Sequence, residues 1–375
     1  MNGPNLRIYW VARCLLKLGL IAIFSLALGA YAQSNHSVHS FIAAPALARN
    51  PESGWVLSFS GSWFHVRDTS DHTTPNDAVS FGGFYSQNRQ WGLSLPFMFY
   101  GKNRSHAITG EVYAADTWFN GFGVGKGFEG ESFLRYDTRM FLMRIQYMKR
   151  MRDWFFVGAK WWGEHQDVSS ADDRWQTLNG HRGGWLSGPA AVAMMDTRDD
   201  IIWTTSGHMA ECSFQRHASW TGSDYTFNRL RLDLRKFIPF GHASTWGTQL
   251  FFDDVRGDVP FYQLPGVAAA RRGRGYYEGR YRDQSLLMLQ SEVRLHFHPR
   301  WSWTCFAHAS LLAQAPNEWF DEEMVAGAGT GLRYHFGARC VNTVRFDVAI
   351  PFASDAWTFA PNRAVKFYVS LGEAF

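Results

Sequence analysis

The chain has 375 residues, of which 46% are hydrophobic, 17% aromatic and 19% charged, and its formal net charge is +4. This small positive charge gives no reason to expect nucleic-acid binding. After about residue 30, no apolar run reaches the ~20 residues that a membrane-spanning helix needs. The 17 tryptophans and 14 tyrosines are instead typical of a membrane β-barrel, in which aromatic girdles border an apolar band.

The amino terminus has the parts of a secretory signal peptide. Basic residues come before and within an apolar run that ends in small residues: Arg7, Arg13, Lys17, residues 18–28 and residues 30–32. The run is short for a membrane anchor, and the residue after the expected cleavage point is Gln33 rather than a lipid-bearing cysteine. We therefore expect a signal peptide over residues 1–32 and a single barrel domain over residues 33–375.

Beyond the signal peptide, apolar and polar residues alternate in segment after segment, as in strands that have one face in lipid. Fifteen such segments follow one another: 54–66, 78–89, 90–101, 104–115, 134–149, 153–167, 186–197, 205–218, 223–238, 243–256, 284–298, 301–313, 324–336, 341–352 and 363–375. Some connections are tight, as at 101–104 and 151–152, and others, such as 116–133 and 257–283, are long. Periplasmic turns are short and outer loops are long, so the first segment runs downward and needs an upward strand before it.

Residues 41–49 supply that strand, because Pro45 within them is tolerated on an edge strand. The last segment ends on Phe375, an ending common among bacterial outer-membrane barrels. We therefore predict an all-β fold, a transmembrane antiparallel β-barrel of about sixteen strands with both termini in the periplasm. Its expected location is the outer membrane of a Gram-negative cell.

The most specific feature is the long connection 257–283. It contains Gly273, Arg274, Gly275 and Tyr276 within the run GRGYYEGRYRD. The two glycines allow sharp backbone turns on either side of the arginine. On the strand that follows, Glu292 has the parity of the polar residues and therefore faces the lumen. An arginine on an inward-folded loop would form a charge-assisted contact with this carboxylate; the alternative is a solvated loop charge.

This loop resembles the conserved loop of the BamA/TamA family of outer-membrane assembly and translocation barrels, in which Val-Arg-Gly-Phe/Tyr precedes Tyr-Arg-Asp. Four further segments resemble that family in the expected order: residues 51–54, 196–199, 344–351 and 369–375. The resemblance implies that the long outer loop folds into the lumen and that Arg274 pairs with Glu292. Gly273 replaces the family's valine, which predicts a looser loop. His308 stands where the family often has a second inward acid, so the anchor is expected to rest on Glu292 alone.

The resemblance also implies a non-enzymatic role in outer-membrane biogenesis, through protein insertion or translocation or through lipid handling, without a cofactor. The seam between the first and last strands would open laterally, because Pro45 lacks a donor and Gly372, close to Phe375, weakens ordered pairing. We expect no periplasmic repeat domain, so other envelope proteins would capture the substrate, and outer-membrane lipid is the second expected partner. The alternative function is a transport pore that the inward-folded loop gates.

Two patterns that suggest ligand sites have simpler explanations. The glycine-rich run 121–127 lacks the GxxxxGK[ST] pattern of a phosphate loop, which favours a flexible barrel loop. His296 and His298 share one strand face but have no third ligand nearby, so we expect no metal site. No serine is spaced as a nucleophile elbow, and we expect no catalytic site.

Two further sets of residues remain open to more than one interpretation. One strand carries alternating charges that either hydrate the lumen wall or favour anionic solutes: Arg229, Arg231, Asp233 and Arg235. The cysteines beyond the signal peptide are odd in number and have no metal-ligand spacing: Cys212, Cys305 and Cys340. They predict no disulfide framework.

Overall fold

The computed structural model describes most of the chain beyond residue 38, in these ranges: 39–50, 54–65, 74–122, 124–125, 134–201, 203–241, 244–268, 272–321, 324–336, 342–353 and 365–371. The expected signal peptide, the turn 51–53, Cys340, Gly372 and Phe375 lie outside these residues. Within them, no helix is long and apolar enough to cross a membrane.

The described residues form sixteen strands, as the alternation predicted. In chain order the strands are β1 (His39–Asn50), β2 (Gly54–His65), β3 (Asp77–Ser86), β4 (Trp91–Tyr100), β5 (His106–Gly121), β6 (Leu134–Arg152), β7 (Phe155–Ser169), β8 (Gly183–Asp196), β9 (Gly207–His217), β10 (Phe227–Phe240), β11 (Ser244–Gly257), β12 (Ser285–His298), β13 (Trp301–Ala313), β14 (Val325–Phe336), β15 (Asn342–Ala353) and β16 (Lys366–Leu371). Five short 3-10 helices lie between them: η1 (Lys102–Arg104), η2 (Asp173–Thr177), η3 (Ser219–Thr221), η4 (Phe261–Gln263) and η5 (Pro316–Asp321). The all-β class and the strand count are confirmed for this part of the chain.

By contacts the chain divides into two units, of which the first comprises Met1–Trp118 and Asp137–Tyr147. In this unit β1 to β5 pair antiparallel in chain order. Pro45 lies in β1 opposite Phe59 of β2, and its side chain is exposed. One face of β2 carries exposed apolar side chains such as Leu57 and Phe59, and serines alternate with them. This period of two is what the sequence predicted for a strand with one apolar face.

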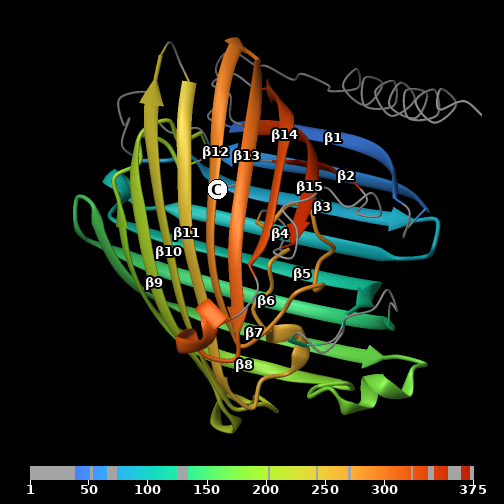
Figure 1. Ribbon diagram of the computed structural model, residues 1–375. Coiled ribbons are helices and arrows are strands. Elements are labelled where there is room, and N and C mark those ends of the chain that lie inside the picture. The colour runs from blue at the N-terminus through green and yellow to red at the C-terminus, as the bar shows by residue number, and fades with distance from the viewer. Residues whose placement is uncertain are drawn as a thin grey trace, which may run out of the picture. The chain divides into compact units, whose positions relative to one another are not determined.

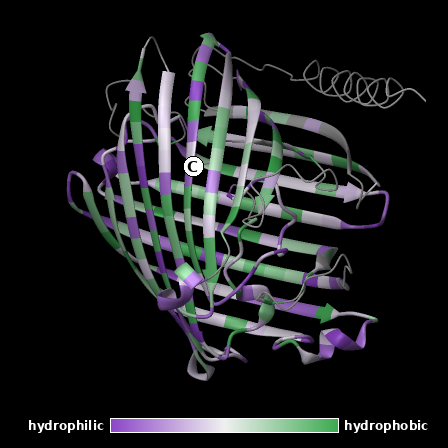
Figure 2. Ribbon diagram, in the orientation of Figure 1, coloured by the Kyte–Doolittle hydropathy of each residue, from purple (hydrophilic) through white to green (hydrophobic). Residues whose placement is uncertain are grey.

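The second unit comprises Phe119–Tyr136 and Met148–Phe375. Its strands β7 to β16 also pair antiparallel in chain order, and β9 to β13 lie side by side in Figure 1. In β12, Gln290 and Glu292 are buried, whereas Leu289 is 51% and Phe297 65% exposed. Figure 2 shows the same alternation as hydrophilic and hydrophobic bands along these strands. The predicted parity of β12 is confirmed.

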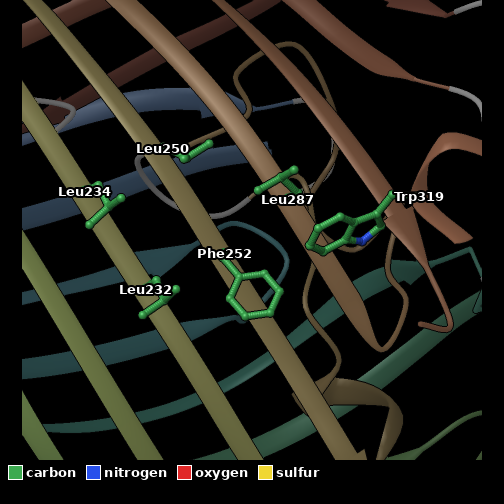
Figure 3. A pocket seen from close by; sticks show the side chains of 6 residues that line it. All are labelled: Leu232, Leu234, Leu250, Phe252, Leu287 and Trp319. Atoms are coloured by element: carbon green, nitrogen blue, oxygen red, sulfur yellow. The ribbon is translucent and has the colours of Figure 1, made fainter. Parts of the chain in front are cut away.

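The outward face of this unit carries a shallow apolar groove of about 280 Å³ over β10, β11 and β12, which η5 borders (Figure 3). Its lining is entirely apolar: Leu232, Leu234, Leu250, Phe252, Leu287 and Trp319. The indole of Trp319 meets the ring of Phe252 edge to face, with 5.6 Å between their centroids. An apolar outward face is what strands in contact with hydrocarbon require.

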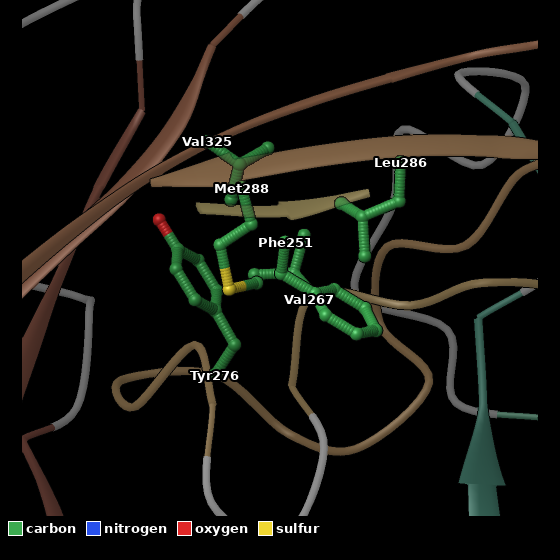
Figure 4. Packing of buried hydrophobic residues seen from close by; sticks show 6 residues of the cluster. All are labelled: Phe251, Val267, Tyr276, Leu286, Met288 and Val325. Carbon is green, nitrogen blue, oxygen red and sulfur yellow. The ribbon is translucent and has the colours of Figure 1, made fainter. Parts of the chain in front are cut away.

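The inward face of β11, β12 and β14 is covered by the connection between β11 and β12. Val267 and Tyr276 of this connection pack against side chains of the three strands in one buried cluster (Figure 4): Phe251, Leu286, Met288 and Val325. Near the start of the same connection, Phe261 packs with Tyr136 and Trp175 in a second cluster. The connection, residues 258–284, is therefore a folded element with apolar contacts at both its start and its tip. We call it the inner loop.

Candidate functional site

The tip of the inner loop turns sharply at two glycines. Gly273 has φ of +61° and Gly275 has φ of +124°, conformations that side chains rarely adopt. A Cβ atom at Gly273 would lie 2.0 Å from the carbonyl oxygen of Val267. Glycine at this position permits a close backbone contact, and the prediction that it loosens the loop stays a prediction. The two turns direct Arg274 toward the wall.

Arg274 is buried and bridges two carboxylates. Its Nη2 donates to Glu292 Oε2 of β12 at 2.7 Å, and its Nη1 donates to Asp347 Oδ2 of β15 at 2.6 Å. The guanidinium carbon also lies 3.3 Å from the centroid of the Phe306 ring of β13, a cation–π contact. The structure thus brings Arg274 and Glu292 together. It also shows that the expectation of a single acid is wrong, since Asp347 is the second one.

Three more buried arginines surround the same two carboxylates. Arg294 Nε donates to Glu292 Oε1 at 2.9 Å, and Arg333 of β14 contacts both carboxylates. Arg345 Nε lies 3.4 Å from Asp347 Oδ2. Among the described residues the cluster therefore contains four guanidinium groups and two carboxylates, an excess of two positive charges. Each carboxylate is thus essential to the balance of buried charge around it.

Arg274 is a permanent cation in this setting. Burial lowers the pKa of Arg274, but the carboxylates of Glu292 and Asp347 raise it by more, so that it stays above its ordinary value. The contact of the loop with the wall is therefore an ion pair at every physiological pH. Double hydrogen bonding of this kind fixes orientation as well as position.

His308, which stands where a second acid was considered, contacts the main chain of the inner loop. Its Nε2 lies 3.1 Å from the carbonyl oxygen of Arg274, and its Nδ1 lies 3.5 Å from the hydroxyl of Ser310. The imidazole thus contacts the main chain of the arginine rather than replacing an acid at the guanidinium. It adds one hydrogen bond to the backbone at the tip of the loop.

Two tyrosines complete the anchor, and the sequence motif contained only the first. The Tyr276 hydroxyl lies 2.6 Å and 2.5 Å from the carbonyl oxygens of Ala326 and Phe352, on β14 and β15. The Gly275 amide donates to the Tyr368 hydroxyl of β16 at 2.8 Å. The parity of Tyr368 on the polar side of the last strand was the only signal for it in the sequence. The tip of the loop therefore contacts β12, β13, β14, β15 and β16.

The start of the inner loop is bound to strands β7 and β10. Arg229 of β10 donates to Asp253 at 2.6 Å and to Gln263 Oε1 of the loop at 3.2 Å. Gln263 Nε2 in turn donates to Glu164 of β7 at 2.9 Å. The arginines of β10 face inward, as predicted, but are engaged in ion pairs: Arg229 and Arg231 with Asp253, and Arg235 with Asp233. This organisation favours a wall that holds the loop over one that binds anionic solutes.

The remaining candidate residues do not join this site. The described residues contain no group of three or more potential ligands that could hold a metal ion. Cys212 and Cys305 are free and exposed. The glycine-rich run 121–127 lies only partly within the described residues, and the seam residues Gly372 and Phe375 lie outside them.

Comparisons with known proteins agree with this picture. BamA from Haemophilus ducreyi lacking POTRA domains 1–3 has a TM-score of 0.57 at 12% identity, over 90% of this chain and 70% of that one. CdiB from Escherichia coli has a TM-score of 0.57 at 11% identity, over 91% of this chain and 63% of that one. CdiB from Acinetobacter baumannii has a TM-score of 0.55 at 9% identity, and the chain spans 89% of its own length and 58% of that protein. These likenesses establish the fold, and no curated protein matches the chain in sequence.

The family follows from the sequence profile rather than from the structures. Residues 163–375, more than half of the chain, match the Omp85 superfamily domain. This region contains the inner loop, all of its anchor residues and the strands β8 to β16. The predicted resemblance to BamA-like outer-membrane barrels is confirmed. The chain is thus a member of the Omp85 superfamily.

Proposed function

We propose that this protein inserts or translocates other proteins at the outer membrane without catalysing a reaction, and that the inner loop is its working element. The observation that supports this proposal is Arg274, which is buried at the tip of the loop and bridges Glu292 and Asp347. Ordering a long connection and the arginine side chain at its tip costs conformational entropy. The contact must therefore contribute enough free energy to offset that cost. Two charge-assisted hydrogen bonds in a buried site supply it.

The contacts of the loop suggest how it acts. Its tip contacts β15 and β16, the last two strands of the chain, through Asp347 and Tyr368. A shift of these strands would therefore change the contacts of the loop. In the proposed mechanism the seam between the first and last strands opens, with Pro45 and Gly372 weakening pairing there. Envelope proteins and outer-membrane lipid are the proposed partners, and the signal peptide 1–32 is removed on export.

The test is complementation of a strain that lacks the protein. The strain should show lower levels of specific outer-membrane or secreted proteins, which the wild type restores and Arg274→Ala does not. Arg280→Ala is the matched control, because Arg280 is an exposed arginine of the same loop. Unchanged protein levels in the deletion strain, or full rescue by folded Arg274→Ala, would refute the proposal. Locking the seam with engineered cysteines should abolish rescue, and full rescue by the locked protein would exclude lateral opening.

A gated pore is the second candidate, favoured by the position of the loop against the inward faces of β10, β11 and β12. Planar-bilayer recordings separate the two functions. A pore should conduct more when residues 258–284 are deleted or when Arg274 is replaced by alanine. Equal and negligible conductance of all forms would exclude it.

A further inference from the structure

The turn between β8 and β9 is closed by hydrogen bonds among its own residues. The carboxylate of Asp199 accepts hydrogen bonds from the amides of Asp200, Thr205 and Ser206 at 3.0, 3.0 and 3.1 Å. Asp200 Oδ1 accepts from the amide of Trp203 at 2.7 Å. Local hydrogen bonds from aspartate to its own following amides are a stable way to close a turn. We call residues 197–206 the β8–β9 turn.

This turn presents Trp203 to two histidines of other strands. The indole meets His335 of β14 edge to face with 3.8 Å between ring centroids, and it meets His296 of β12 at 5.0 Å. His335 is held between the hydroxyls of Ser302 and Thr343, at 2.9 and 3.1 Å. The indole therefore packs against an imidazole whose orientation is already fixed. Such an aromatic contact specifies where the turn lies.

The turn also contacts the arginine cluster. The carbonyl oxygen of Thr204 accepts from Arg294 Nη1 at 3.4 Å, and Thr204 is buried. Arg294 Nε donates to Glu292 Oε1, and the other oxygen of the same carboxylate accepts from Arg274. The inner loop and the β8–β9 turn thus reach the same carboxylate, one directly and one through Arg294. The carbonyl of Thr204 is therefore one of the acceptors that fix the position of the Arg294 guanidinium.

The two segments approach Glu292 from opposite ends of the strands. The inner loop joins the end of β11 to the start of β12, whereas the β8–β9 turn joins the end of β8 to the start of β9. In an antiparallel order of strands these two connections lie at opposite edges. If the loop is on the outer side, the turn is on the periplasmic side.

We propose that the β8–β9 turn is a positioning element for the inner loop, in which Trp203 and Thr204 hold Arg294 so that Glu292 keeps Arg274 in place. Displacement of the turn from the periplasmic side then weakens the hold on the loop. A polypeptide arriving from the periplasm meets the turn before it meets the loop. This last step rests on the proposed function, whereas the coupling between turn and loop does not.

The coupling can be measured on the purified full chain in lipid nanodiscs, without any complementation assay. Ala268→Cys, in a chain whose other cysteines are replaced by serine, reports the release of the loop through its rate of reaction with a hydrophilic maleimide. Ala268 is half-buried against the cluster that contains Tyr276. Trp203→Ala should raise this rate about tenfold or more, the range of coupling between residues that share a network. Trp220→Ala, which removes a 70% exposed tryptophan of the β9–β10 connection, should leave it within about twofold.

A second comparison tests the route through the carboxylate. In a Glu292→Gln background the loop is already released, so Trp203→Ala should change the rate by less than about twofold. Equal rates for Trp203→Ala and Trp220→Ala, or a full additional effect in the Glu292→Gln background, would overturn the proposal. Heat-dependent migration in gels reports folding, and Trp203→Phe serves where Trp203→Ala does not fold, with the same outcomes. If labelling behaves as expected while complementation fails, only the proposed function is wrong.

Discussion

Replacing Glu292 by glutamine tests the anchor of the inner loop most directly. Glutamine has the shape of glutamate, so the change removes one negative charge and little volume. The Glu292 side chain is fully buried and contacts Arg274, Arg294 and Arg333. Among the described residues its loss leaves four arginines with one carboxylate, so the excess of buried positive charge rises from two to three.

The size of the effect follows from burial. Breaking a buried ion pair by removing one partner costs about 3–5 kcal/mol, because the remaining charge stays desolvated. An exposed pair contributes only about 0–1 kcal/mol. Asp116→Asn is therefore the matched control, since Asp116 pairs with Arg139, whose side chain is 76% exposed. We expect Glu292→Gln to raise the unfolding equilibrium constant by about two to four powers of ten and Asp116→Asn by less than one.

The assay is urea unfolding of the barrel in lipid vesicles, followed by tryptophan fluorescence and by the heat-dependent shift in gel migration. The free energy of unfolding is compared among the wild type, Glu292→Gln and Asp116→Asn at one lipid composition. Labelling of a cysteine in the inner loop then shows whether the loop has left the wall. If Glu292→Gln costs no more than Asp116→Asn and leaves the loop protected, the contact between Arg274 and Glu292 does not hold the loop.

Three further predictions concern the loop and the β8–β9 turn. Gly273→Ala should destabilise the folded loop by more than Gly222→Ala, since both have positive φ but only Gly273 faces a backbone carbonyl within 3 Å; equal unfolding midpoints would contradict this. Tyr276→Phe should cost about 1–3 kcal/mol because buried carbonyl oxygens lose their donor, whereas Tyr281→Phe should cost little, and equal losses in urea unfolding would count against the role of the hydroxyl. Burial raises the pKa of Asp199, but hydrogen bonds from Thr205 and neighbouring amides lower it by more, so it lies below its ordinary value. Ionised Asp199 stabilises the turn above about pH 4, and this contribution is lost as pH falls through the lower pKa of the folded state. Amide exchange in the turn, corrected for intrinsic rates, should therefore stay slow down to about pH 4 and accelerate below it. Asp199→Asn should abolish this change, and a wild-type change near pH 6 would refute the assignment.

The strands were predictable because their signal is local. Alternation along each segment gives the face of every residue, and residues 41–49, with their proline, were recovered from the parity of the strand count. Glu292 could be placed on the inner face for the same reason. The motif around Arg274 identified Glu292 as one partner, because the loop and the strand that follows it are close in the chain.

The other partners of the loop come from distant strands. Asp347 is 73 residues from Arg274, and Tyr368 is 93 residues from Gly275. Alternation shows that each faces inward but does not show its height along the strand. That height depends on the register of every strand pair in between. The sequence therefore pointed to His308 as the position of a second acid, whereas the second acid is Asp347 on β15. The close approach of Gly273 to the carbonyl of Val267 was not predictable for the same reason, since it depends on the folded loop.

The sequence by itself determined the all-β class, the sixteen strands, the inward and outward faces and the loop that carries Arg274, because these depend on parity and on short motifs. Only the tertiary structure decided which charges meet around that arginine, that the Gly275 amide donates to the Tyr368 hydroxyl of β16, and that the carbonyl of Thr204 accepts from Arg294. Those contacts depend on strand register and on loops crossing the inner face. They are properties of the folded arrangement and of no single segment.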